Sequence, residues 1–140
     1  MASLSQIRSG IKTTIEANVS ALTVYHKMPE QVNGDSVLCE PSGTDFAKSF
    51  GRGLDEYEFN LFVFVPMVEW DSAQDRVDGY ITGAGASSIR QVVFQNRTLG
   101  LTSTDAHISK MMGYGAQYKV ANLQFIGAAL KLIVVTDGSA

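Results

Sequence analysis

A chain of 140 residues is long enough to bury a core of its own as one domain, without support from metal ions or disulfides. Its hydrophobic share of 45% and charged share of 18% are close to those of average globular domains, which argues against a disordered or fibrous chain. The net charge of −3 argues against a protein whose main task is to neutralise nucleic-acid phosphate.

The first half of the chain reads as a helix followed by strands. Apolar residues near the start recur at spacings of three and four, which predicts an amphipathic helix over about residues 3–18: Leu4, Ile7, Ile11 and Ile15. A first strand is expected over residues 21–29, ending at Pro29. After an Asn-Gly turn signal, a short second strand is expected over 36–41, ending at Pro41.

Residues 46–65 are predicted to form a hairpin with its tip at Gly51-Arg52-Gly53 and a long second arm. Alternation along that arm places one wholly apolar set of side chains on one face: Tyr57, Phe59, Leu61, Val63 and Val65. The opposite face changes from polar to aromatic along the arm: Glu58, Asn60, Phe62 and Phe64. Such a change suggests that a helix or another subunit covers this face only partway along the strand, which Pro66 closes.

Two helices and two strands are expected in the second half. Asp71 or Ser72 is predicted to cap the first helix, whose apolar stripe is Ala73, Val77, Tyr80 and Ile81. A further helix is expected over residues 87–95, and strands over 106–120 and 122–135. The order favours one α+β domain over residues 1–140, a twisted, mainly antiparallel sheet with the N-terminal helix and the central helical pair packed on it.

The sequence between the two central helices, "TGAGASS", raises two readings. Glycines before a helix can cradle phosphate, but the dinucleotide fingerprint requires a preceding strand and a third glycine, and here Ser88 takes that third position. No lysine follows as in a P-loop either. The second reading is a helix-to-helix corner, in which Gly83 or Gly85 has a positive φ and Ser87 or Ser88 caps the next helix.

The residues that most often carry chemistry are sparse. His26 and His107 have no carboxylate or cysteine at metal-ligand spacing, and Cys39 has no second cysteine to pair with. We therefore expect no cofactor, no metal and no enzymatic activity, with Cys39 as a buried or half-buried strand residue. The apolar stretches 61–68 and 126–135 are about half of the roughly 20 residues that span a membrane, so no membrane partner is expected.

Two features suggest contacts between subunits. The acidic residues Asp55, Glu56 and Glu58 lie beside Arg52, and could form a paired-carboxylate site, a solvated turn or ion pairs across a subunit boundary. Trp70, the single tryptophan, either packs over the end of the sheet or anchors an interface, since tryptophan and arginine dominate binding hot spots.

Four stretches in order resemble one known family: "MPEQVNGDS", "SFGRGLDEYEFNLFVFV", "YITGAGASSIRQVVFQNRTLG" and "MMGYGAQYKVANLQFIGAALKLIVV". Together they resemble the small tail terminator (tail completion) proteins of long-tailed siphophages, particularly those that infect actinobacteria. The resemblance runs from the amphipathic start to Val135.

The resemblance implies a helix-covered twisted sheet that assembles into a hexameric ring. Such a ring caps the tail tube, ends its polymerisation and offers the surface that joins the head. It implies as partners further copies of the chain, the tail tube protein and the head-tail connector or stopper proteins, with DNA passing through without specific binding. The expected location is the neck end of the virion tail, after assembly in the host cytoplasm.

Two alternatives stay open at the level of sequence. A head-side completion or stopper protein of the same neck would bind the portal complex instead of the tube. A small nucleotide-binding enzyme that uses the loop at Gly83 is the alternative from a different class.

Overall fold

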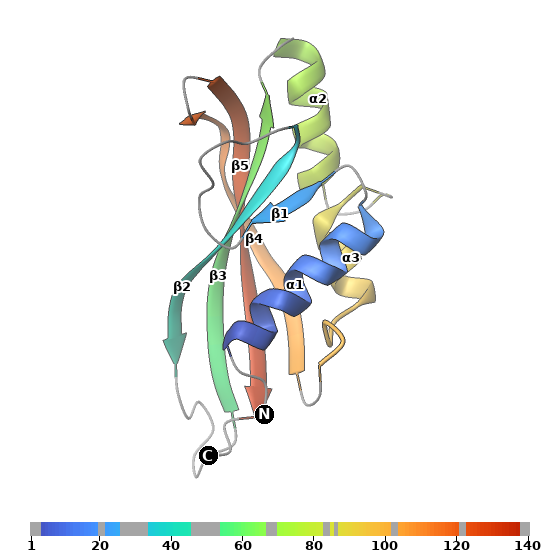
Figure 1. Cartoon of the computed structure of the whole chain (residues 1–140), viewed down its shortest axis with the longest axis vertical. Helices are drawn as coiled ribbons and strands as arrows, with labels where there is room; N and C mark the ends of the chain where they lie inside the picture. Colours follow the sequence, from blue (N-terminus) through green and yellow to red (C-terminus); the bar gives the residue numbers. More distant parts are fainter. Residues whose placement is uncertain are drawn as a thin grey trace.

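The computed structural model describes residues 4–19, 22–25, 34–45, 54–66, 70–82, 85, 87–101, 104–120 and 123–137. Over these residues the chain forms three helices and five strands, in the order α1 (Leu4–Asn18), β1 (Thr23–Tyr25), β2 (Ser36–Asp45), β3 (Leu54–Pro66), α2 (Trp70–Ile81), α3 (Ile89–Gln95), β4 (Thr104–Val120) and β5 (Leu123–Asp137). The described strands build one sheet with the spatial order β1-β2-β3-β5-β4 (Figure 1).

The sheet is mixed. β1 runs parallel to β2 over three residue pairs, whereas the pairings β2–β3, β3–β5 and β5–β4 are antiparallel. The prediction of an α+β fold with an N-terminal helix and two further helices is therefore confirmed. The expected first strand is present as β1, and its parallel direction at one edge is what the sequence did not indicate.

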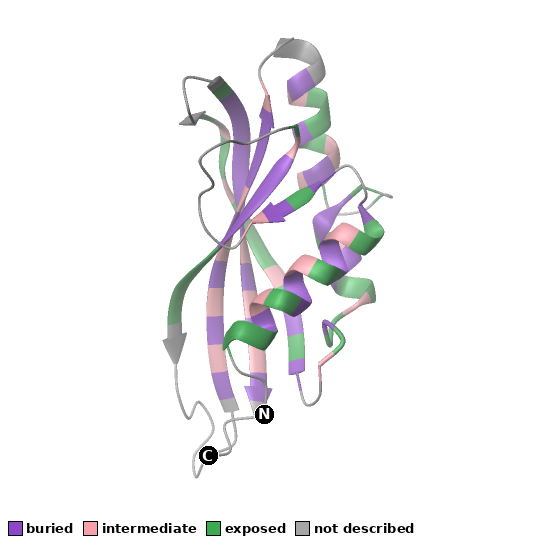
Figure 2. Ribbon diagram, in the orientation of Figure 1, coloured by how far each residue is buried: buried purple, intermediate pink, exposed green. Residues whose placement is uncertain are grey.

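One continuous core lies between the sheet and all three helices. It contains the apolar face predicted for β3 together with the inward residues of α1, α2 and α3: Ile7, Ile11, Ile15, Tyr57, Phe59, Leu61, Val63, Val65, Ala73, Val77, Tyr80, Ile89, Val92 and Val93. The helices therefore cover a single face of the sheet, and Figure 2 shows the buried stretches of the strands beside them.

The other face of the sheet has a smaller apolar cluster at one end. Leu38, Phe64 and Phe125 are buried there, and Tyr25 and Phe62 pack against them. The rings of Phe64 and Phe125 meet edge to face with centroids 6.3 Å apart. This confirms the change from polar to apolar that the alternation along β3 predicted.

The described strands and helices differ from expectation at several ends. β2 continues past Pro41 to Asp45, because a bulge between Pro41 and Gly43 accommodates the proline near a sheet edge. β3 pairs with β2 itself, while the expected first arm of the hairpin and its tip, residues 46–53, lie outside the described residues. Residues 26–29 of the expected first strand also lie outside them.

The start of the second helix was predicted two or three residues too late, since a cap at Asp71 or Ser72 places the first helical residue at 72 or 73. α2 begins at Trp70, so Asp71 and Ser72 lie inside its first turn instead of capping it. A residue within the first turn has helical backbone angles, whereas an N-cap residue has an extended backbone.

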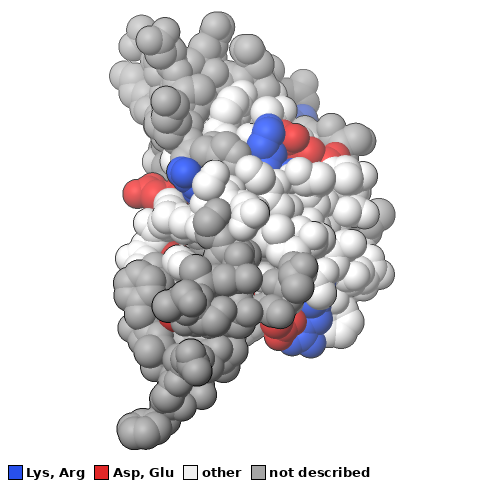
Figure 3. All heavy atoms as spheres, turned by 60° about the horizontal axis from the view of Figure 1, so that its bottom comes forward, with Lys and Arg blue, Asp and Glu red and all other residues white. Residues whose placement is uncertain are grey.

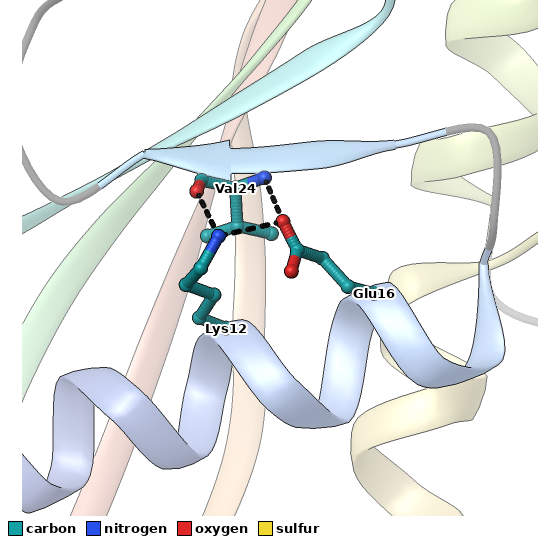
Figure 4. A network of polar contacts seen from close by, with 3 residues as sticks. All are labelled: Lys12, Glu16 and Val24. Carbon is teal, nitrogen blue, oxygen red and sulfur yellow. Dashed lines mark hydrogen bonds and ion pairs between the residues drawn. The ribbon is translucent and has the colours of Figure 1, made fainter.

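Helix α1 is fastened to the outer side of β1 by a small polar network (Figure 4). The carboxylate of Glu16 accepts hydrogen bonds from the Val24 N–H at 3.0 Å and from Lys12 Nζ at 2.8 Å. Lys12 Nζ also donates to the Val24 carbonyl at 3.1 Å. Both outward backbone groups of Val24 are thereby satisfied by side chains, as a strand edge in a folded protein requires.

We predict that Leu61→Ala lowers the free energy of unfolding by about 2–5 kcal/mol, because it opens a cavity at the centre of the core. Leu61 has no exposed surface, whereas Leu4 on α1 is 37% exposed. Leu4→Ala is the matched control and should lower it by at most about 1 kcal/mol. Urea denaturation followed by circular dichroism measures both, and equal losses would contradict the described core.

Candidate subunit interface

The residues predicted to contact a neighbouring subunit are placed unequally. Arg52 lies outside the described residues, so its pairing with carboxylates stays a prediction. Trp70 is the first residue of α2, not a residue ahead of it, and its side chain is outside the described part. The three acidic residues all lie on strand β3 and not in a turn.

The pleat of β3 separates these three carboxylates. Asp55 is 8% exposed and shares its face with the core residues, whereas Glu56 and Glu58 point to the opposite face. On that face Glu58 forms an ion pair with Lys131 of β5 at 3.2 Å. The three carboxylates therefore do not form one group, because Asp55 lies on the opposite face of the sheet from Glu56 and Glu58.

The glycine and serine loop between α2 and α3 is a helix-to-helix corner. Gly85 has a φ of 124°, and Ser88 is the N-cap of α3, accepting a hydrogen bond from the Gln91 N–H at 3.2 Å. The Ser88 hydroxyl also donates to the Thr82 carbonyl, and its side chain is buried. Both local predictions are confirmed, while Gly83 lies outside the described residues.

Burial and hydrogen bonding shift the pKa values of two described residues near the core, Cys39 and Tyr80. Burial raises the pKa of the Cys39 thiol to about 12, which removes the thiolate that nucleophilic chemistry needs. Burial, and then the hydrogen bond to Asp35, raise the pKa of Tyr80. Arg76 Nε lies 3.3 Å from the same Asp35 carboxylate, so this group joins α2 to the turn before β2.

A surface that the sequence analysis did not single out lies where α3 meets β4. A hollow of about 360 Å³ is lined by Arg90, Phe94, Arg97, Ala106, His107 and Ile108. Phe94 is 59% exposed. Arg97 forms a bidentate salt bridge with Asp105, with both hydrogen bonds 2.8 Å long. Phe94 could have been noticed as an apolar residue outside the stripe formed by Ile89, Val92 and Val93.

Further along β4, two more large apolar side chains are exposed. Met111 and Tyr114 are 44% and 45% exposed. The Tyr114 hydroxyl donates to Asp78 of α2 and accepts a hydrogen bond from Gln74 Nε2 of the same helix at 3.2 Å. The hydrogen bond to Asp78 raises the pKa of Tyr114. Large exposed apolar side chains along one strand are typical of a contact surface.

The sheet leaves two stretches of edge open among the described residues. β1 covers β2 only at Ser36–Leu38, so no described strand pairs with the outer side of residues 39–45. At the other side, β4 is the last strand, and the Ala106 N–H donates outward to the Arg97 carbonyl at 2.7 Å. Beyond Ala106 no further backbone hydrogen bond along this edge is found within the described ranges. Open edges are sites at which another chain can pair.

Charged side chains on the described surface are mixed in sign. Figure 3 shows, on one face, small groups in which basic and acidic atoms adjoin, around a wide uncharged area. Within the described ranges, no group of three or more His, Cys, Asp or Glu side chains is arranged to hold a metal ion. No helix there is long and apolar enough to cross a membrane.

Comparison with known proteins leaves the family open. A scan of the chain against protein-family models found no match, and a search of the curated proteins found none. The resemblance to tail terminators therefore stays a prediction from the four sequence stretches.

We predict that Glu16→Ala lowers the free energy of unfolding by about 1–2 kcal/mol, because the Val24 N–H loses its charged acceptor at a partly exposed position. Thr13→Ala, on the exposed side of the same helix, is the control and should change it by less than about 0.5 kcal/mol. Urea denaturation measures both, and a Glu16→Ala loss no larger than the control's would show that the network in Figure 4 does not stabilise the fold.

We predict that the protein loses stability as the pH rises above about 9, in part through Cys39. The folded-state pKa of about 12 lies above the ordinary value of 9.0, so the folded state keeps a proton that the unfolded state releases. This contribution is complete below pH 9 and is lost toward pH 12. Urea denaturation at pH 8 and pH 10 should give a smaller drop for Cys39→Ala than for the unmodified chain, and equal drops would contradict the prediction.

Proposed function

We propose that this chain is a structural virion protein that forms a ring on the end of a phage tail tube, ends polymerisation of the tube and provides the surface that joins the head. The proposal begins with the four ordered sequence stretches that resemble siphophage tail terminators. An α+β fold with helices on one face of a sheet is compatible with it, although many other proteins share that architecture.

The observation that carries the proposal furthest is that, among the described residues, the sheet has open edges on two opposite sides. A closed ring of identical subunits requires two different patches on each subunit, one for each neighbour. The outer half of β2 and the long strand β4 provide two such patches, and they differ in sequence and in shape. Pairing them between copies would also cover edges that otherwise invite aggregation.

The charge of the chain suits a ring through which DNA passes. Every phosphate that a protein neutralises adds affinity through counterion release, so a conduit should present few unpaired cations. The net charge is −3, and Lys12, Arg97 and Lys131 each lie within 3.2 Å of a carboxylate oxygen. These ion pairs support passage of DNA without retention.

We predict that phage with a nonsense codon early in this gene make overlong tail tubes beside filled heads without tails. Without a terminator, nothing stops the addition of tube subunits once the normal length is reached. Negative-stain electron microscopy of lysates gives the distribution of tube lengths. Expression of the wild-type gene in the host is the control and should restore normal tails.

The same micrographs separate the head-side alternative. Tails of normal length that lie detached beside leaking heads would contradict a terminator and favour a head completion or stopper protein. Tails and heads that join normally would contradict both neck functions.

A further inference from the structure

We propose that neighbouring copies of this chain join edge to edge, with strand β4 of one copy against the outer half of β2, residues 39–45, of the next. The inference rests on the proposed ring and names the surface that holds it together. The occupant of the β4 edge is thus a second copy of this chain, and the contact is centred on Glu40 of one copy and Lys110 of the other.

The direction of the strands allows such a joint. Three successive antiparallel pairings lead from β2 through β3 and β5 to β4, so β2 and β4 run in opposite directions. When a rotation places the β2 edge of one copy beside the β4 edge of another and continues the sheet, the two strands are antiparallel. Antiparallel pairing is the slightly more stable arrangement.

The register places Glu40 and Lys110 at the two ends of one row across the sheet. Glu40 is opposite Asn60, Asn60 is opposite Lys131, and Lys131 is opposite Lys110. Directly opposite residues in antiparallel strands point to the same face, so the whole row lies on the face away from the helices. If neighbouring copies pair in the register that continues this row, the Glu40 carboxylate of one copy lies beside the Lys110 ammonium of the next.

The charges within the row show why a neighbour's carboxylate fits there. Two lysines directly opposite each other, Lys131 and Lys110, repel. Lys131 is compensated by Glu58 of its own chain at 3.2 Å, and Lys110 is exposed at the sheet edge. Glu40 is exposed at the opposite edge, so the joint supplies Lys110 with a carboxylate.

The same charges disfavour a two-fold dimer. Joining β4 to β4 would place Lys110 on both sides of the joint, and each Lys110 is already opposite Lys131 of its own chain. Joining β2 to β2 would place the exposed Glu40 on both sides of the joint. Unlike edges therefore attract and like edges repel, which selects the head-to-tail contact that closes a ring.

Apolar contacts on the other, helix-covered side of the same edge add affinity, while the backbone ladder is short. Phe94, Met111 and Tyr114 are exposed along the β4 edge, and the hollow between α3 and β4 is open beside them. Pro41 has no N–H to donate, and bulges interrupt both β2 and β4. Only a few backbone hydrogen bonds are available, so we expect side-chain contacts to decide the affinity.

The test is a charge swap between the two edges. Glu40→Lys and Lys110→Glu should each weaken assembly by at least about tenfold in the concentration at which half of the chains are assembled. The variant with both changes should assemble within about threefold of the unmodified chain, because every contact again joins opposite charges. Sedimentation velocity over a range of concentrations gives the mass distribution of each protein.

The controls separate charge from folding. Ser9→Glu with Thr13→Glu on the exposed side of α1 makes the same change in net charge as Lys110→Glu and should assemble as the unmodified chain does. The thermal midpoint of each variant at low concentration shows whether it is folded. If a reversal unfolds the chain, Glu40→Gln and Lys110→Gln take its place, with a smaller expected loss.

The outcomes for the joint and for the ring are distinguishable. If the unmodified chain assembles and both single reversals assemble equally well, or the double variant is no better than the singles, the joint is wrong and the ring stands. If the unmodified chain is monomeric both alone and with purified tail tubes, the ring itself is wrong. If it assembles only on tubes, the same variants are compared by their binding to tubes.

Discussion

The antiparallel ladder between β3 and β5 is the interaction on which the rest of the structure depends. It runs without a break in register from Leu54 opposite Asp137 to Pro66 opposite Phe125. Because side chains alternate along both strands, one uninterrupted register brings the apolar residues of the main core to one face, and the three helices pack there. A slip by one residue would turn that face toward solvent, so the position of every helix follows from this pairing.

A sheet built on such a ladder has edges, and among the described residues these edges differ in whether side chains satisfy their backbone groups. At β1 the side chains of Lys12 and Glu16 satisfy the backbone groups of Val24, which closes that short edge from within the chain. The outer half of β2 and the edge of β4 have no comparable cover among the described residues. Over the described residues, one closed edge and two open ones, with Glu40 at one open edge and Lys110 at the other, connect the fold with the proposed assembly.

Local chemistry accounts for the features that the sequence predicted correctly. The helical spacing of Ile7, Ile11 and Ile15, the corner at Gly85 and Ser88, and the two faces of β3 depend on residues close in sequence. The errors occur where neighbours in space decide. Pro41 was expected to end a strand, but beside a bulge near an edge it does not. The carboxylates of β3 were expected as a group, but Asp55 is buried on one face while Glu58 pairs with Lys131 on the other.

The sequence by itself determined the type and order of the elements, because hydrophobic periodicity and turn residues act over a few positions. It also carried the resemblance on which the proposed function rests. Only the tertiary structure decided which strands lie at the edges, that β1 runs parallel, and that Glu40 and Lys110 end the same row. These are properties of pairing between residues far apart in the chain, and single-chain spacing contains no information about which distant strands become neighbours.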